Sequence, residues 1–266
     1  MHGIPRTFPL VDVHFHPFED PMDPDTGAVM ARAREVSVIA AVAAGVDVAT
    51  SERVLELARG IPGLAPAVGL HPWFLDPSPD MEALERLAED AAVVAVGEIG
   101  LDGACDTPST HQERWFRNQL ALARSLGLPV VVHARRAVAR VAEILGEFPE
   151  VRGVLHSFPG GPDIARGLVD AGWCVSFSGS VTRPGAKRVH RLARELPDHG
   201  ILVETDAPAI GLTDIAAGDV EPREAARVAA ALAALREVDP ARIAAITFEN
   251  TRRVFGPRLD PTLEEH

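Results

Sequence analysis

Two histidines separated by one residue lie near the start of the chain, in the stretch DVHFHPF (12–18). On a strand, side chains two residues apart point to the same face, so His14 and His16 would direct two imidazoles toward one point. That arrangement suits a metal ion. The alternative is a pair of hydrogen-bonded core histidines, and an isolated pair of this kind does not decide between the two.

Other polar residues follow apolar runs in the same manner. They are His71, Glu98, His133, His156 and Asp206. A buried imidazole or carboxylate is costly unless it is paired or liganded, and a single one is usually a satisfied core group. Together with the histidine pair they number seven, and such a set would destabilise the core if unpaired. Metal ions would remove that cost, which favours a metal centre.

Eight apolar runs would position these residues, at 10–16, 36–46, 64–71, 93–102, 129–135, 151–158, 174–180 and 201–208. Near-continuous apolar runs are typical of strands buried on both faces of a parallel sheet. Between and after them lie segments with apolar residues at helical spacing, at 51–60, 81–91, 111–127, 137–148, 163–172, 186–196, 222–238 and 240–256. The alternation predicts a TIM-like (β/α)8 barrel. An open doubly wound sheet is the alternative, and it is disfavoured because no glycine-rich phosphate-binding motif follows a strand.

In such a barrel the C-terminal ends of the strands form the mouth, where active sites are built. Apart from His71, the polar residues there offer four imidazoles and two carboxylates. One catalytic zinc usually takes about three protein ligands, so this set fits two ions about 3.5–4 Å apart. Glu98 is the best bridging ligand because its two oxygens can each bind one metal. A water shared by both ions would be the nucleophile, which suits hydrolysis of phosphate esters or amides.

Composition limits the classes of partner. The net charge of −12 disfavours a broad basic face for nucleic acid, although a local cationic groove or bound metal ions could still attract it.

No linker or repeat is evident, so we predict one domain, 1–256, and a C-terminal tail, 257–266. Cys105 and Cys174 form no CxxC motif and fit reduced thiols. We find no signal peptide and no membrane span, which predicts a cytoplasmic protein; nothing points to an oligomeric state.

Nine stretches together resemble the TatD family of metal-dependent DNases, within the amidohydrolase superfamily. They run in the family's order and cover nearly the whole chain: DVHFH (12–16), AVGLHPW (67–73), VGEIGLD (96–102), QERWFRNQLALARSLGLPVVVHAR (112–135), GVLHSFPG (153–160), GWCVSFSGSVT (172–182), LVETDAP (202–208), EP (221–222) and NTRRVFG (250–256). The resemblance implies a TIM-like barrel, a divalent metal site and hydrolase activity. Departures occur at Gly103, Ala104, Arg136 and Val220, and they concern substrate preference.

The resemblance also implies a role for each residue at the mouth. One ion would be held by His14, His16, Glu98 and Asp206, and the other by Glu98, His133 and His156. Asp206 would also orient or deprotonate the attacking water, and His71 would face the scissile phosphate. The alternative for His71 is a loop histidine beside Pro72 without a role in the site. The ions would be Zn, Mn, Mg, Fe, Co or Ni, since imidazoles, carboxylates and phosphate together accept all of them.

Other residues can support this site. Arg135 lies two positions after His133, so the same strand face would present a guanidinium that can clamp a phosphate. The alternative is that Arg135 pairs with a carboxylate at the rim. Asp12 and Glu204 each lie two positions before a proposed ligand, and one of them could accept an N–H from a ligand histidine. A buried ion pair with an arginine is the alternative for both. Trp73 could stack a nucleobase or pack at the mouth.

The sequence therefore predicts a metal-dependent hydrolase that cleaves phosphodiester bonds in DNA, at strand ends or in single strands, or in small phosphodiesters. One alternative is hydrolysis of a small amide or ester on the same metal centre, since fold and ligands do not separate the two reactions. Another alternative is a barrel without catalytic activity that serves as a binding protein. Such a barrel would be expected to have lost its ligands, whereas all six ligand residues are present here.

Overall fold

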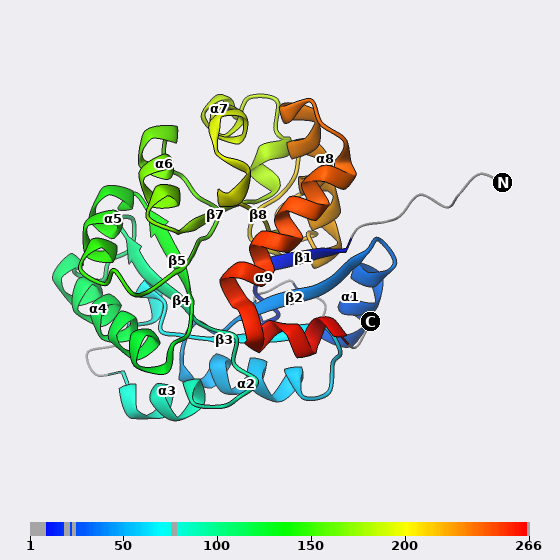
Figure 1. Cartoon of the computed structure of the whole chain (residues 1–266). Coiled ribbons are helices and arrows are strands. Elements are labelled where there is room, and N and C mark those ends of the chain that lie inside the picture. Colours follow the sequence, from blue (N-terminus) through cyan, green and yellow to red (C-terminus); the bar gives the residue numbers. More distant parts are fainter. Residues whose placement is uncertain (1–8, 19–21, 23–24, 76–78, 265–266) are drawn as a thin grey trace.

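The computed structural model describes residues 9–18, 22, 25–75 and 79–264. Its eight strands form one sheet in the order β1 to β8, and each strand pairs in parallel with the next (Figure 1). The strands are β1 (Leu10–Phe15), β2 (Val38–Ala44), β3 (Leu64–Val68), β4 (Ala95–Asp102), β5 (Val130–Arg135), β6 (Gly153–Leu155), β7 (Cys174–Phe177) and β8 (Ile201–Val203). The predicted TIM-like barrel is confirmed, and the open doubly wound sheet is excluded.

Backbone hydrogen bonds close the barrel between β1 and the residues after β8. The N–H of Asp206 donates to the carbonyl oxygen of His14 at 3.0 Å, and the N–H of His16 donates to that of Ala207 at 2.8 Å. We call residues 14–16 and 206–207 the closing seam. Three of the predicted metal ligands lie in it, so barrel closure itself brings the two ends of the sheet, and their side chains, together.

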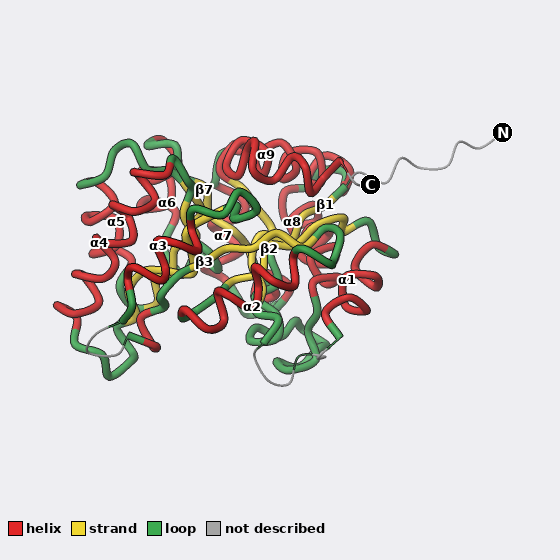
Figure 2. The backbone as a smooth tube through the Cα atoms, turned by 90° about the horizontal axis from the view of Figure 1, so that it is seen from below, coloured by secondary structure: helices red, strands yellow, loops and turns green. Residues whose placement is uncertain are grey.

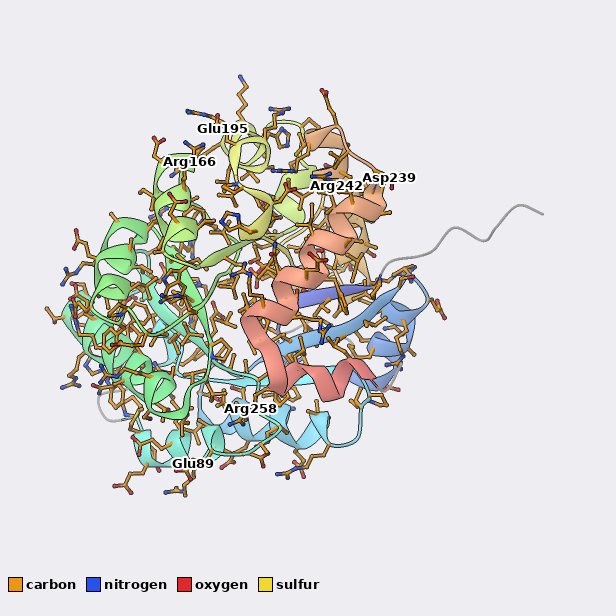
Figure 3. All side chains as sticks on the ribbon, viewed as in Figure 1. Glu89, Arg166, Glu195, Asp239, Arg242 and Arg258 are labelled. Carbon is orange, nitrogen blue, oxygen red and sulfur yellow. The ribbon has the colours of Figure 1, made fainter. Side chains whose placement is uncertain are left out.

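Helices surround the strands and present charged residues to the outside, as Glu89, Arg166 and Glu195 show in Figure 3. The helices are α1 (Thr26–Arg34), α2 (Val48–Ala58), α3 (Met81–Ala88), α4 (Ser109–Leu126), α5 (Val138–Gly146), α6 (Pro162–Asp170), α7 (Lys187–Glu195), α8 (Ala225–Arg236) and α9 (Pro240–Glu264). Short 3-10 turns include η1 (Pro72–Phe74) and η4 (Pro222–Glu224). Every predicted helix is present, although the one expected from 222 begins as η4. None of the described helices has the length and apolar composition needed to cross a bilayer.

The barrel interior is filled by small and branched apolar residues. One cluster has buried members on every strand, such as Val13 of β1 and Val131 of β5, and includes Phe255 and Leu259 of α9. Helix α9 therefore covers one end of the barrel (Figure 2). The polar residues predicted to form the site lie at the opposite end, where strands finish.

The C-terminal segment differs from the frayed tail that we expected after residue 256. The backbone turns at Gly256, with φ 49° and ψ −135°, and helix α9 then continues to Glu264. Leu259 has no exposed surface because it packs under the strands. The first eight residues of the predicted domain and the last two of the predicted tail lie outside the described residues.

Candidate metal centre and active site

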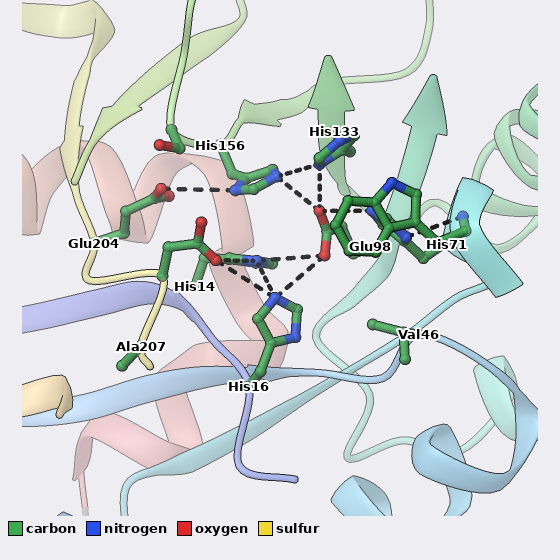
Figure 4. Close-up of polar contacts among 12 residues, drawn as sticks. His14, His16, Val46, His71, Glu98, His133, His156, Glu204 and Ala207 are labelled. Atoms are coloured by element: carbon green, nitrogen blue, oxygen red, sulfur yellow. Dashed lines mark hydrogen bonds and ion pairs between the residues drawn. The ribbon is translucent and has the colours of Figure 1, made fainter. Parts of the chain in front are cut away.

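Glu98 lies at the centre of a ring of imidazoles, and its two carboxylate oxygens face different histidines (Figure 4). Oε2 lies 3.5 Å from Nε2 of His14 and 3.4 Å from Nε2 of His16. Oε1 lies 2.8 Å from Nδ1 of His133 and 2.7 Å from Nε2 of His156. Glu98 is only 2% exposed. One buried carboxylate is therefore shared between two separate groups of nitrogen donors.

The first donor group consists of His14, His16, Asp206 and Oε2 of Glu98. The Nε2 atoms of the two histidines lie 3.1 Å apart, and Oδ1 of Asp206 lies 3.5 Å from the first and 3.4 Å from the second. Two ligand atoms that each lie about 2.1 Å from one zinc-sized ion are roughly 3–3.5 Å apart. The spacing in this group therefore fits a cation held between the four side chains.

The second donor group consists of His133, His156 and Oε1 of Glu98. Nδ1 of His133 lies 3.0 Å from Nε2 of His156, which is again the separation of atoms that share an ion. Nε2 of His71 lies 3.4 Å from the same Glu98 oxygen, so this histidine reaches the edge of the group. All six side chains that were expected to be ligands thus converge around Glu98, and their spacing is compatible with the two sets that the family resemblance implies.

Local backbone features place these side chains. His133 lies within β5, whereas His71, His156 and Asp206 lie just beyond the ends of their strands. Asp206 adopts φ +52°, a left-handed conformation that costs energy for a residue other than glycine and that is common at functional sites. Gly100 of β4, with φ +141°, pairs with His133, and a Cβ there would collide with the His133 carbonyl oxygen. A glycine is therefore needed where β4 brings Glu98 beside His133.

The outward-facing nitrogens of two ligand histidines meet carboxylates. Nε2 of His133 lies 3.2 Å from Oδ2 of Asp102, and Nδ1 of His156 lies 3.6 Å from Oε1 of Glu204. Such partners orient a ligating imidazole and fix which nitrogen faces the metal. The Ser176 hydroxyl holds the other Glu204 oxygen. Glu204 thus faces His156 at ion-pair distance without a hydrogen bond, and it forms no ion pair with an arginine among the described residues.

Asp12 has a different role from the one that we considered. Its carboxyl accepts hydrogen bonds from the backbone N–H groups of His14 and Thr205 and contacts the Thr205 hydroxyl. It contacts neither a ligand imidazole nor an arginine among the described residues. Asp102, in contrast, was missed by the sequence analysis. The signal was its position at the end of the same strand as Glu98, four residues on, which places both on one face.

Electrostatics at the centre favour a bound cation. Burial would raise the pKa of Glu98, but His71, His156 and His14 hold it well below its usual range. Burial and His156 would lower the pKa of His14, yet Glu98 and Asp206 raise it to about 9. In the absence of metal, protons on imidazoles therefore balance the carboxylates. Metal ions would replace those protons, as they do at sites built from such ligands.

A cavity of about 760 Å³ opens above the donor groups. His71 and Arg135, the predicted substrate-facing residues, both line it, and so do Trp73 and Phe74. Nδ1 of His71 accepts the backbone N–H of Trp73 at 3.2 Å, and burial lowers the pKa of the imidazole. His71 is therefore a neutral side chain whose remaining N–H, on Nε2, points toward Glu98.

Comparison with known proteins agrees with this geometry. The model of the family described as "TatD related DNase" matches residues 11–256. The chain is 34% identical to the uncharacterized metal-dependent hydrolase YabD of Bacillus subtilis over 92% of its own length and 98% of that protein. It is 33% identical to the 3'-5' ssDNA/RNA exonuclease TatD of Musicola paradisiaca, over 92% of the chain and 97% of the relative.

A solved structure shows the same architecture. The crystal structure of YjjV, a TatD homologue from Escherichia coli, superposes with a TM-score of 0.87 at 34% identity. The match covers 92% of this chain and 97% of that one. An uncharacterized amidohydrolase from Saccharomyces cerevisiae shares the fold at 18% identity, with a TM-score of 0.77.

Proposed function

Because the chain belongs to the TatD-related DNase family and is a metal-dependent hydrolase, we propose that it cleaves phosphodiester bonds in DNA with two divalent cations. The observation that carries this proposal is the division of the ligands into two groups that share Glu98. The relative named an exonuclease acting on ssDNA and RNA supports strand ends or single strands as the substrate.

We assign one cation to His14, His16, Glu98 and Asp206, and the other to Glu98, His133 and His156. Together they would act as Lewis acids toward the phosphate and lower the pKa of water. The imidazoles suit Zn, Mn, Fe, Co or Ni, and the carboxylates with a substrate phosphate also accept Mg.

The remaining steps fall to the side chains around the ligands. Burial would raise the pKa of Asp206, but His14 and His16 lower it, so the carboxylate stays ionised and can orient the attacking water by accepting a hydrogen bond. We also assign it the proton of that water, as the family resemblance implies. His71 offers a neutral N–H donor to a phosphate oxygen. Arg135, half exposed at the cavity wall, can clamp the phosphate with two parallel hydrogen bonds.

The charge of the protein supports a small substrate or a strand end over a long duplex tract. The net charge is −12, and Arg135 is the one arginine or lysine among the residues that line the described cavity. Long nucleic acids are held by many phosphate contacts, which a single guanidinium does not supply. We also propose a cytoplasmic location, which is supported by Cys105 and Cys174 being free thiols.

The test is a turnover panel on protein reconstituted with Mg²⁺, Mn²⁺ or Zn²⁺. Substrates are end-labelled single-stranded oligonucleotides, the matched duplex, a nucleotide diester and acylated small molecules. We expect cleavage of the single strand and loss of that activity in Glu98→Gln. Acyl hydrolysis with no nuclease activity under any of the three metals would instead support the amide or ester alternative. Less than one bound ion per chain would favour a non-catalytic barrel.

A further inference from the structure

We propose that Trp73 is the platform on which the unpaired terminal base of the substrate stacks, and that it sets the preference for single-stranded ends. The inference rests on the proposed nuclease function and identifies the residue that would recognise such a substrate. Four observations on Trp73 support it: exposure, anchoring, distance from the metal centre, and a neighbouring cation.

Solvent exposure distinguishes Trp73 from the other tryptophans of the chain. Trp73 is 51% exposed and its neighbour Phe74 is 50% exposed, whereas the other two tryptophans, Trp115 and Trp173, are 7% and 3% exposed. Both exposed rings line the cavity above the metal centre. Contiguous exposed aromatic surface next to a site commonly marks where a ligand binds.

Anchoring keeps the exposed indole in one orientation. Its Nε1–H donates to Oδ2 of Asp102 at 2.6 Å, and Asp102 is itself buried and lies against His133. The backbone N–H of Trp73 is also bound, to Nδ1 of His71. The ring is thus tied along its nitrogen edge while half of the residue stays open. A platform fixed in this manner loses little conformational entropy when a ligand binds.

Distance and charge place the platform one step from the reacting phosphate. The rings of Trp73 and His71 lie 5.5 Å apart, and Nε2 of His71 is 3.4 Å from Glu98. The guanidinium carbon of Arg135 lies 5.9 Å from the Trp73 ring centre. A phosphate held near the metals, His71 and Arg135 would leave its own nucleoside within reach of the indole.

Stacking of this kind selects for an unpaired base and tolerates any base. Every nucleobase has an aromatic face, so recognition by an indole depends little on sequence. A base within a duplex is covered on both faces by its neighbours and would have to unstack first. The platform therefore explains a preference for frayed or single-stranded ends without requiring base-specific hydrogen bonds.

The kinetic test compares Trp73→Leu and Trp73→Phe with the wild type. Substrates are a short oligodeoxynucleotide and matched oligonucleotides that lack the base at one end or the other. Stacking is worth about 1–3 kcal/mol per base, so Trp73→Leu should raise KM about 5- to 150-fold on the complete oligonucleotide. On the substrate whose missing base is the one that stacks, KM should already be raised and should change little further. Trp73→Phe keeps an aromatic face without the bond to Asp102 and should retain much of the affinity.

A fluorescence titration tests binding independently of turnover. Because the other two tryptophans are buried, adding the oligonucleotide should quench Trp73 emission in the wild type and leave the emission of Trp73→Leu unchanged. Equal metal content and melting temperature of the variants serve as the folding control.

The outcomes separate the two proposals. Cleavage by the wild type, with equal KM changes on complete and abasic substrates or with no quenching, would overturn the platform and leave the nuclease function standing. Absence of cleavage would overturn the nuclease function, and the quenching titration would still decide whether the indole binds a base.

Discussion

Asp12 supplies a prediction whose size can be worked from the structure. This residue has no exposed surface, and it accepts hydrogen bonds from the backbone N–H groups of His14 at 3.2 Å and Thr205 at 2.9 Å. It thereby ties β1 to the residue that precedes Asp206. Burial raises the pKa of Asp12 to about 8, although the hydrogen bonds from Thr205 and His14 oppose the shift. We therefore expect the carboxyl to be protonated in the folded, metal-free protein at neutral pH.

The consequence for stability has a definite sign. The pKa of Asp12 is about 8 in the folded chain and 3.8 in the unfolded chain, so its stabilising contribution is complete below pH 3.8. That contribution is lost as the pH rises toward 8, by about 1.4 kcal/mol per pH unit. The amide introduced by Asp12→Asn would mimic the protonated carboxyl and would not titrate. Between pH 5 and pH 7 the wild type should therefore lose about 3 kcal/mol of stability relative to Asp12→Asn.

Asp12→Ala serves as the matched comparison. It removes the acceptor and leaves two buried N–H groups without a partner, at about 1–3 kcal/mol each, with no dependence on pH from this position. The measurement is the free energy of unfolding in urea for metal-free wild type and both variants at pH 5, 6 and 7. A constant difference between wild type and Asp12→Asn would show that the folded protein holds an ionised Asp12, and would refute the reasoning.

Four further predictions concern the centre and the barrel. Glu98→Gln should at least halve the metal content per chain after reconstitution, measured by elemental analysis; two retained ions would argue against a bridging role. His71→Ala should keep its metal but lose about 100-fold or more in kcat/KM on the oligonucleotide, since it removes the N–H that would donate a hydrogen bond to the phosphate; an unchanged value would exclude contact with substrate. Metal binding at pH 7 should release protons, because neighbouring carboxylates raise the pKa of His14 to about 9. The affinity for metal should therefore rise with pH up to that value. Calorimetry in buffers of different ionisation enthalpy would detect the proton release or its absence. Leu259→Ala should destabilise the protein by about 2–5 kcal/mol in urea denaturation, and a change below about 0.5 kcal/mol would mean that this segment does not pack against the barrel.

The barrel and its proposed ligands were predictable because six of the eight apolar runs carry a histidine or carboxylate that has no reason to be buried alone. Periodicity shows where a strand lies, but not where its hydrogen-bonded ladder stops. The sequence could not show that β3 ends at Val68 and that His71 lies beyond it, capping η1. That turn decides which nitrogen of His71 faces the site, so the tautomer emerges only from the folded chain.

The supporting carboxylates were harder to rank from sequence. Asp12 and Glu204 have the same spacing from a ligand, and yet one binds backbone N–H groups while the other faces His156. The difference arises from the closing seam, where β1 meets the segment after β8. The packing of Leu259 beneath the strands was equally hidden, since the sequence analysis expected only a tail from residue 257.

The closing seam joins the first and last strands of the sheet through short stretches of backbone, and the side chains that we assign to one cation lie on both sides of it. His14 and His16 belong to the beginning of the chain, whereas Asp206 comes from the final strand connection. An ion bound there would cross-link two segments that are almost two hundred residues apart in sequence. A bound metal ion would thus add to the backbone hydrogen bonds that already close the barrel between its first and last strands.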